Sequence, residues 1–147
     1  TTEIYTLSLH DALPILYNMI KELDLEDNVK FTGRLSAEQM ANTMEKCHIF
    51  VNPSCMEVHA LSLRESMIVG LPCILAQCGR VVEFLQHKVN GLLYRYEEYE
   101  SLAYYMNILF SNPEMCNDFS DKASKTFDRS DSKSLDLNRI YMNLFAE

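Results

Sequence analysis

The chain has 147 residues, of which 48% are hydrophobic, so it is long and apolar enough to bury the core of one domain. Its net charge of -8 argues against nucleic acid and anionic membrane surfaces as partners, because both favour clusters of Lys and Arg. The five cysteines include no C-x-x-C pair, which indicates reduced thiols rather than a disulfide framework or a zinc site. Since the sequence shows no signal peptide and no transmembrane segment, we expect a cytoplasmic protein.

The first fifteen residues fit poorly with the pattern of the rest. They combine short alternations of apolar and polar residues with Pro14, and no clear boundary separates them from the helix that follows. They also resemble a peptide translated from sequencing-adapter read-through. We therefore predict that residues 1–15 are in part foreign to the fold and that the domain covers residues 16–147.

From Leu16 onward, segments with helical periodicity alternate with short apolar runs. We expect a helix from Leu16, a strand at 29–32, and a helix that begins after Ser36, which has Gln39 at capping-box spacing. The run 73–76 is apolar throughout, as in a strand buried on both faces. The other predicted elements are a strand at 48–51, a helix from about 60, a short helix at 81–86, a strand at 92–94, and helices at 99–110, 113–127 and 135–145.

This alternation predicts an α/β fold, with a Rossmann-like parallel sheet covered by helices on both faces and followed by C-terminal helices. Ligands bind such sheets beyond the carboxyl ends of the strands. The loop after the strand at 48–51 lies at one of these ends, and it contains Glu57. We therefore expect a ligand site at this loop.

Residues 52–72 are predicted to form the end of a strand, a loop and a helix, and they carry two carboxylates. Glu57 and Glu65 are eight positions apart, which places Glu57 at the mouth of the helix and Glu65 on its flank. Carboxylates accept hydrogen bonds from sugar or ribose diols, whereas the N–H groups of a helix start at 58–62 suit a diphosphate. The combination favours a nucleotide sugar, although two acidic residues at this spacing are also common on a solvated helix face.

A series of short motifs runs in a fixed order through residues 16–127. The series comprises V-x-F-x-G at 29–33, CHIFVNPS at 47–54, two glutamates with seven residues between them at 57–65, ESM-x-x-G-x-P at 65–72, Glu83, and NGLL at 90–93. This series resembles the retaining glycosyltransferases of the GT-B fold, in the large family four group. The resemblance implies transfer of a sugar from a nucleoside diphosphate sugar to an acceptor with retention of configuration, without a cofactor or an obligatory metal.

The resemblance also implies which residues bind the donor: Gly33, Arg34, Glu57, His59, Ala60, Leu61, Ser62 and Glu65. Glu57 is in addition the implied catalytic residue, because it approaches the donor sugar's hydroxyls and its reacting face. Glu65 would hold the ribose hydroxyls, and the amides of residues 59–62 would receive the diphosphate and stabilise the leaving group. Residues 33–34 would lie at the nucleotide base.

Two features depart from the family pattern. Val58-His59-Ala60 stands in place of the usual glycine-rich sequence. Because these residues have side chains, the backbone cannot approach the phosphates as closely as it can with glycine. The family's first strand and helix, with the Arg and Lys for the diphosphate, have no match upstream of residue 16, and the N-terminal domain is absent. We therefore expect an N-terminally truncated C-terminal half of a GT-B fold, inactive alone, whose acceptor glycan, lipid or small molecule binds the missing domain.

Two alternative functions share this fold class. A nucleotide-sugar epimerase of the GT-B fold has the same nucleotide domain and differs by an upstream domain with acid and base residues. A non-enzymatic regulatory domain of the receiver-like α/β type needs a pair of Asp residues at strand ends. This chain has Thr32 and Asn52 there, which counts against the regulatory domain.

Overall fold

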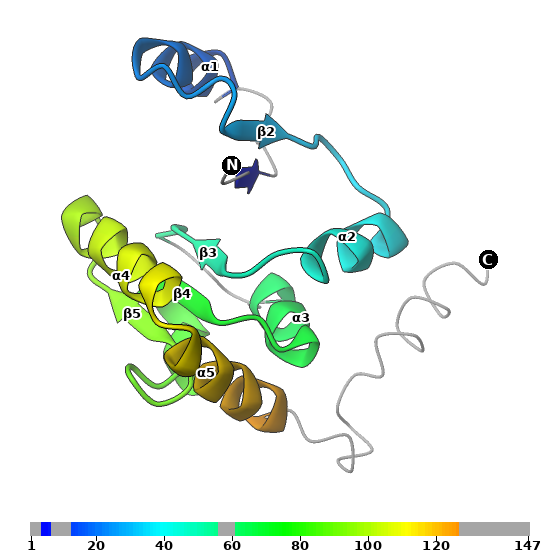
Figure 1. Cartoon of the computed structure of the whole chain (residues 1–147), viewed down its shortest axis with the longest axis vertical. Helices are drawn as coiled ribbons and strands as arrows, with labels where there is room; N and C mark the ends of the chain where they lie inside the picture. The colour runs from blue at the N-terminus through cyan, green and yellow to red at the C-terminus, as the bar shows by residue number, and fades with distance from the viewer. Residues whose placement is uncertain (1–3, 7–12, 56–60, 127–147) are drawn as a thin grey trace. The chain divides into compact units, whose positions relative to one another are not determined.

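The structure, a computed structural model, describes residues 4–6, 13–55 and 61–126. By its internal contacts the chain divides into two compact units, residues 1–40 and residues 41–147, which are treated one at a time below. Figure 1 shows their helices and strands. The domain boundary predicted at residue 15 stays a prediction, and the helix predicted at 135–145 lies outside the described residues.

The first unit contains a short parallel strand pair and a helix. Strand β1 (Ile4–Thr6) pairs with β2 (Val29–Phe31) over three residues each, with Ile4 opposite Val29. Helix α1 (Leu13–Glu22) lies between them in sequence. Its Tyr17 ring packs on the ring of Phe31, with 4.4 Å between the two ring centroids. Strand β1 was not predicted from the sequence, whereas α1 and β2 were.

Helix α2 (Ala37–Met44) begins with the capping box predicted from the sequence. The backbone N–H of Ser36 donates to Oε1 of Gln39 at 2.9 Å, and the backbone N–H of Gln39 donates to Oγ of Ser36 at 3.3 Å. These two bonds satisfy N–H groups that have no partner within the helix. The prediction of this helix start is therefore confirmed, and the helix ends at Met44.

The second unit is built on a three-stranded parallel sheet. Its elements in chain order are β3 (Phe50–Asn52), α3 (Leu61–Val69), β4 (Cys73–Ala76), the 3-10 turn η1 (Gly79–Glu83), β5 (Leu92–Tyr94), α4 (Tyr99–Ser111) and α5 (Pro113–Thr126). The strand order is β3-β4-β5, with Phe50 opposite Cys73 and Ile74 opposite Leu92. Hydrogen bonds thus join the described strands into one parallel sheet in each unit, where the sequence analysis expected a single sheet.

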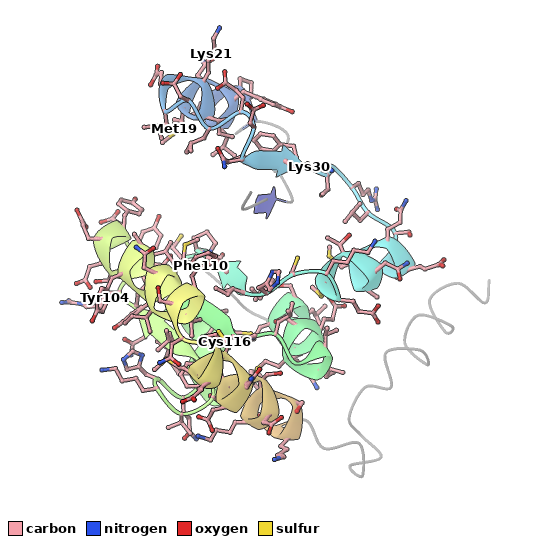
Figure 2. All side chains as sticks on the ribbon, viewed as in Figure 1. Met19, Lys21, Lys30, Tyr104, Phe110 and Cys116 are labelled. Carbon is pink, nitrogen blue, oxygen red and sulfur yellow. The ribbon has the colours of Figure 1, made fainter. Side chains whose placement is uncertain are left out.

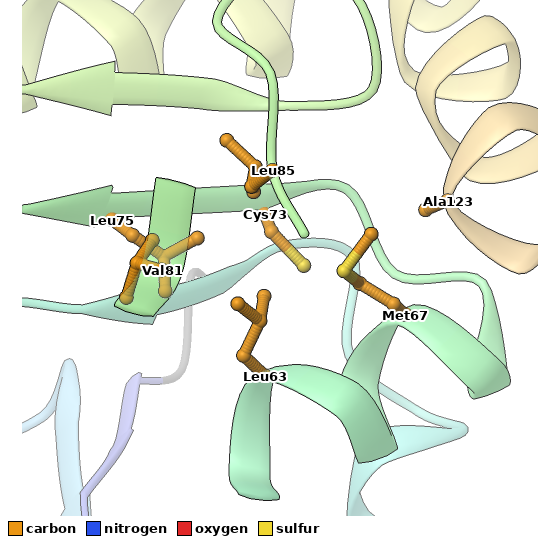
Figure 3. Packing of buried hydrophobic residues seen from close by; sticks show 7 residues of the cluster. All are labelled: Leu63, Met67, Cys73, Leu75, Val81, Leu85 and Ala123. Carbon is orange, nitrogen blue, oxygen red and sulfur yellow. The ribbon is translucent and has the colours of Figure 1, made fainter. Parts of the chain in front are cut away.

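The central strand β4 is buried on both faces, as its apolar sequence predicted. Cys73 and Leu75 pack on one face with Leu63 and Met67 of α3, in the cluster drawn in Figure 3. The residues that alternate with them in β4 face the other side, where they pack with β5, α4 and α5. Helices therefore cover both faces of this sheet, and the predicted α/β class is confirmed.

The turn that leads into β5 depends on Asn90, which is only 7% exposed. Its Oδ1 accepts from the backbone N–H of Gln86 at 2.7 Å, and its Nδ2 donates to the carbonyl of Phe84 at 2.9 Å and to Oγ1 of Thr126 at 3.1 Å. Because the Asn90 side chain takes the Gln86 N–H, the chain does not continue as a helix there. The short helix predicted at 81–86 is for this reason a 3-10 turn that ends at Glu83.

Helices α4 and α5 are separated by Asn112, whose Oδ1 accepts from the backbone N–H of Met115 at 3.0 Å. Pro113 occupies the first position of α5, as predicted, where its missing N–H costs no helical hydrogen bond. Tyr104 and Phe110 project from α4 and are 62% and 76% exposed, and Figure 2 shows both side chains. Among the residues that the structure describes, no helix is both long and apolar enough to cross a membrane.

Candidate functional site

The candidate site lies at the carboxyl edge of the three-stranded sheet. Because β3, β4 and β5 are parallel, the residues that follow Asn52, Ala76 and Tyr94 emerge at the same edge. Helix α3 returns from this edge to the start of β4, so its first turn opens toward the loops. This is the arrangement in which α/β proteins bind ligands.

Three hydrogen bonds hold the strand ends and loops of this edge together. Oδ1 of Asn52 accepts from the backbone N–H of Ser54 at 3.0 Å, which turns the chain directly after β3. Sγ of Cys78 then donates to the carbonyl of Ser54 at 2.9 Å, and the backbone N–H of Gln77 donates to the carbonyl of Tyr94 at 2.7 Å. The loop after β3 is therefore tied to β4, and β4 to β5.

Helix α3 positions three of the predicted donor-binding residues. Leu63 and Met67 are fully buried and fix the helix on the sheet, while Leu61 at the first position is 57% exposed. Ser62 and Glu65 are half-buried, so both contact the protein and reach its surface. The N–H groups of the first turn have no partner within the helix and carry the positive end of its dipole, which suits an anionic group.

The other predicted site residues fall elsewhere. Glu57, His59 and Ala60 lie outside the described residues, so the catalytic role of Glu57 stays a prediction. Gly33 and Arg34 follow β2 in the first unit, where both are exposed and Gly33 has a positive φ of 64°. The structure thus brings together Leu61, Ser62 and Glu65.

Thiols and phenols gather at this same edge, and the sequence analysis missed them. The Tyr96 hydroxyl hydrogen-bonds with the Cys55 side chain, and this bond, together with the charge on Cys55, raises the pKa of the phenol. Burial raises the pKa of Tyr94, with smaller contributions from Tyr99 and Cys78. The strand register would have revealed the group, because Cys55, Cys78 and Tyr96 each stand three residues beyond a registered position.

A separate cavity of about 460 Å³ lies between α4, α5 and the start of β5. Its lining includes Lys88, Tyr104, Asn112 and Asp118, and none of the site residues predicted from the sequence contributes to it. The cavity lies at the end of β5 that is opposite the carboxyl edge, because Leu92, the first residue of β5, lines it. It is therefore not part of the candidate donor site.

His87 lies beside the strand β5 and not at the carboxyl edge. Its Nδ1 accepts from the backbone N–H of Leu93 at 3.0 Å, which requires the neutral imidazole. Burial, and to a smaller extent the charge of Lys88, lowers the pKa of His87. His87 is thus a structural acceptor, and it is not a candidate for the chemistry of the site.

In the described ranges, His, Cys, Asp and Glu side chains form no group of three or more that could hold a metal ion. Among the described residues, this edge presents the first turn of α3 and a group of thiols and phenols, and α3 also carries Glu65. A positive helix end next to a carboxylate can bind a ligand that carries both phosphate and hydroxyl groups. The expectation that no metal is required stays a prediction.

Comparison with known sequences identifies a family. The family model of glycosyl transferases group 1 matches residues 15–126. An uncharacterized glycosyltransferase of Haemophilus influenzae is 33% identical over 109 residues, which are 74% of this chain and 30% of that protein. The amylovoran biosynthesis glycosyltransferase AmsK of Erwinia amylovora is 32% identical over 94 residues, 60% of this chain and 23% of that protein. The chain thus spans about a third or less of the length of these relatives.

Solved structures share the fold. HepE of Anabaena, in complex with UDP, superposes with a TM-score of 0.80 at 23% identity, over 97% of this chain and 39% of that chain. The C-terminal domain of a glycosyl transferase group 1 family protein, LpcC of Francisella tularensis, gives a TM-score of 0.73 at 19% identity, over 80% of this chain and 60% of that chain. The fold is therefore that of a C-terminal GT-B glycosyltransferase domain.

Proposed function

Since this chain belongs to the glycosyl transferases group 1 family, we propose that it is the donor-binding part of a retaining glycosyltransferase. The enzyme transfers a sugar from a nucleoside diphosphate sugar to an acceptor glycan, lipid or small molecule. The observation that supports this proposal is the order of β3 and α3, in which the first turn of α3, with Leu61 and Ser62, follows the carboxyl end of a strand in a parallel sheet and Glu65 lies on the same helix. Family membership favours this function over an epimerase and over a regulatory domain.

In the proposed site, α3 supplies the contacts to the nucleotide. Glu65 accepts hydrogen bonds from the ribose hydroxyls, and its half-buried position supports this role because a partly desolvated carboxylate binds hydroxyls more strongly than an exposed one. The backbone N–H groups at Leu61 and Ser62, together with those of His59 and Ala60, bind the diphosphate. They stabilise the negative charge that develops when the glycosidic bond breaks, so no divalent ion is required.

The remaining roles belong to residues that precede α3 in the sequence. Glu57 approaches the reacting face of the donor sugar and is the catalytic residue. Gly33 and Arg34 bind the nucleotide base. Structures of HepE are described in complex with UDP, with UDP and glucose, and with UDP-glucose, which supports uridine nucleotides as the first donors to test.

Saturation-transfer NMR with UDP, GDP and their glucose and mannose conjugates tests donor binding. We expect signal from at least one of these nucleotides and a weaker signal from the variant Glu65→Gln. A hydrogen bond to a charged group contributes about 1.5–3 kcal/mol, so the loss of the carboxylate weakens binding about ten- to a hundredfold. The matched control is Glu114→Gln, because Glu114 is an exposed glutamate at the start of α5, away from the carboxyl edge. Equal binding by both variants, or no binding by any nucleotide, contradicts the proposal.

We further propose that the acceptor site lies on a part of the enzyme outside these 147 residues, and that the enzyme is cytoplasmic. The chain alone then has negligible transferase activity, even where it binds the nucleotide. Incubation with UDP-glucose or GDP-mannose and a panel of acceptor sugars and lipids, followed by detection of the glycosylated acceptor together with released UDP or GDP, measures this directly. Robust turnover by the chain alone would place the acceptor site within it.

A further inference from the structure

Two cysteines lie in neighbouring loops at the carboxyl edge. Asn52 of β3 pairs with Leu75 of β4, and Cys55 and Cys78 each follow three residues later, in the loops beyond the ends of the two strands. Neighbouring strands lie about 4.8 Å apart, so the two loops leave the sheet at a separation within the range of about 4.4–6.8 Å that is usual for the Cα atoms of a disulfide.

The hydrogen bond between the two loops shows that they stay adjacent after the ladder ends. Sγ of Cys78 donates to the carbonyl oxygen of Ser54 at 2.9 Å, and Ser54 is covalently joined to Cys55. The sulfur of Cys78 thus contacts the carbonyl group of the peptide bond that joins Ser54 to Cys55. On the other side, Cys55 is the main cause of the raised pKa of Tyr96, so the two side chains are neighbours at this edge.

The two thiols also differ from the other three in what surrounds them. Cys55 is exposed, so an oxidant in solution can reach it, and Cys78 is half-buried. Cys73 is buried and contacts Ser66. The Cys47 thiol donates to the carbonyl of Thr43 in α2, and the Cys116 thiol of α5 donates to the carbonyl of Leu109 in α4. Only the thiols of Cys55 and Cys78 occupy neighbouring loops at the carboxyl edge.

We propose that Cys55 and Cys78 form a modification site that closes to a disulfide by exchange with a low-molecular-weight disulfide such as oxidised glutathione. The Cys55 thiolate attacks one sulfur of oxidised glutathione, forms a mixed disulfide and releases one glutathione thiolate. The Cys78 thiolate then attacks the Cys55 sulfur and releases the second glutathione. Two protein thiols are oxidised to one disulfide, one glutathione disulfide is reduced to two thiols, and the two protons go to solvent or to the glutathione thiolates.

Closure of this disulfide covalently joins the loop after β3 to the loop after β4. The closed ring contains the whole of α3, so the crosslink restricts the unfolded chain over this segment. The oxidised protein is therefore expected to melt at a higher temperature than the reduced protein. This site does not depend on the proposed transferase function, because exchange requires the two thiols and the oxidant alone.

Peptide mapping of the whole chain tests the site. The chain is incubated in buffers of increasing oxidised-to-reduced glutathione ratio, alkylated, and digested with chymotrypsin. Cleavage after Phe50, Leu61, Leu75 and Phe84 gives peptides 51–61 and 76–84, each with one cysteine, and so separates Cys55 and Cys78 from Cys47 and Cys73. We expect a crosslinked pair of these two peptides that disappears on reduction.

Two variants give the test a matched comparison. Cys78→Ser should stop at the mixed disulfide on Cys55, which adds one glutathione to peptide 51–61, whereas Cys116→Ser should form the crosslink as the parent chain does. Alkylation of both cysteines at every glutathione ratio contradicts the proposal. A stable mixed disulfide on Cys55 in the parent chain contradicts it as well, because Cys78 would then be out of reach.

Discussion

Replacement of Asn90 by alanine tests how the turn before β5 is held. The side chain makes three hydrogen bonds, which link the end of η1, the following segment and the end of α5. Alanine removes all three and leaves the Gln86 N–H and the Phe84 carbonyl without these partners. Asn90 itself is buried, so water does not replace the bonds without rearrangement of the turn.

Each of these bonds contributes about 0.5–1.5 kcal/mol net, so the free energy of unfolding should fall by about 2–4 kcal/mol. With a urea dependence of about 2 kcal/mol per molar, the midpoint of unfolding should fall by about 1–2 M. Circular dichroism during urea titration measures this midpoint. The control Asn107→Ala removes an exposed asparagine from the middle of α4, where alanine has the higher helix propensity, and should leave the midpoint equal or slightly raised. Equal midpoints for the two variants would refute the structural role of Asn90.

Three further predictions concern the same part of the second unit. Gly91→Ala should lower the urea midpoint, because an added Cβ would lie 2.6 Å from Cδ1 of Leu85 and must displace it; an unchanged midpoint would contradict this packing. Burial lowers the pKa of His87 below the ordinary value of 6.5, so the bond from Leu93 stabilises the fold fully above that pH and is lost as the pH falls through the lowered value. The melting temperature should therefore fall more between pH 8 and pH 5 for the parent chain than for His87→Asn, because the amide oxygen of asparagine accepts a hydrogen bond at both pH values. An equal fall in melting temperature for the two chains would contradict the role of His87 as an acceptor. Burial raises the pKa of Cys73 to about 12, so at pH 8 iodoacetamide should label it only in urea, and rapid labelling of the native protein would contradict its burial.

Local patterns in the sequence were sufficient to predict several of the helices and strands. The apolar run 73–76 predicted the buried central strand β4, because a strand covered on both faces has no polar positions. Ser36 and Gln39 predicted the start of α2, since the capping box is formed by residues close in sequence. The helix from about residue 60 is confirmed as α3, which begins at Leu61 in the described residues.

Features that depend on long-range contacts could not be predicted in this way. The short helix predicted at 81–86 is confirmed only in part, as the 3-10 helix η1 at Gly79–Glu83, and the bond from Asn90 to Thr126 of α5, which holds the turn after it, is not visible in the local sequence. The contact between Cys78 and the carbonyl of Ser54 depends on how β3 pairs with β4, which a single sequence does not reveal. Strand β1 is three residues long and has no periodicity of its own, so only its pairing with β2 defines it.

The candidate site was predicted in part. The sequence indicated the residues of α3, and the structure places Leu61, Ser62 and Glu65 together at the carboxyl edge. It did not indicate the thiols and phenols beside them, because these come from three different loops. The roles of the individual residues in donor binding stay predictions.

Chemical-shift mapping with UDP tests most directly whether the carboxyl edge binds the nucleotide. Two-dimensional ¹H–¹⁵N spectra of the labelled chain are recorded as UDP is added. We predict saturable shifts of the backbone amides of Leu61 and Ser62, which are lost or weakened in Glu65→Gln. Shifts confined to the cavity between α4 and α5, at Tyr104 and Asn112, or no saturable shift at any amide, would contradict the assignment of the donor site.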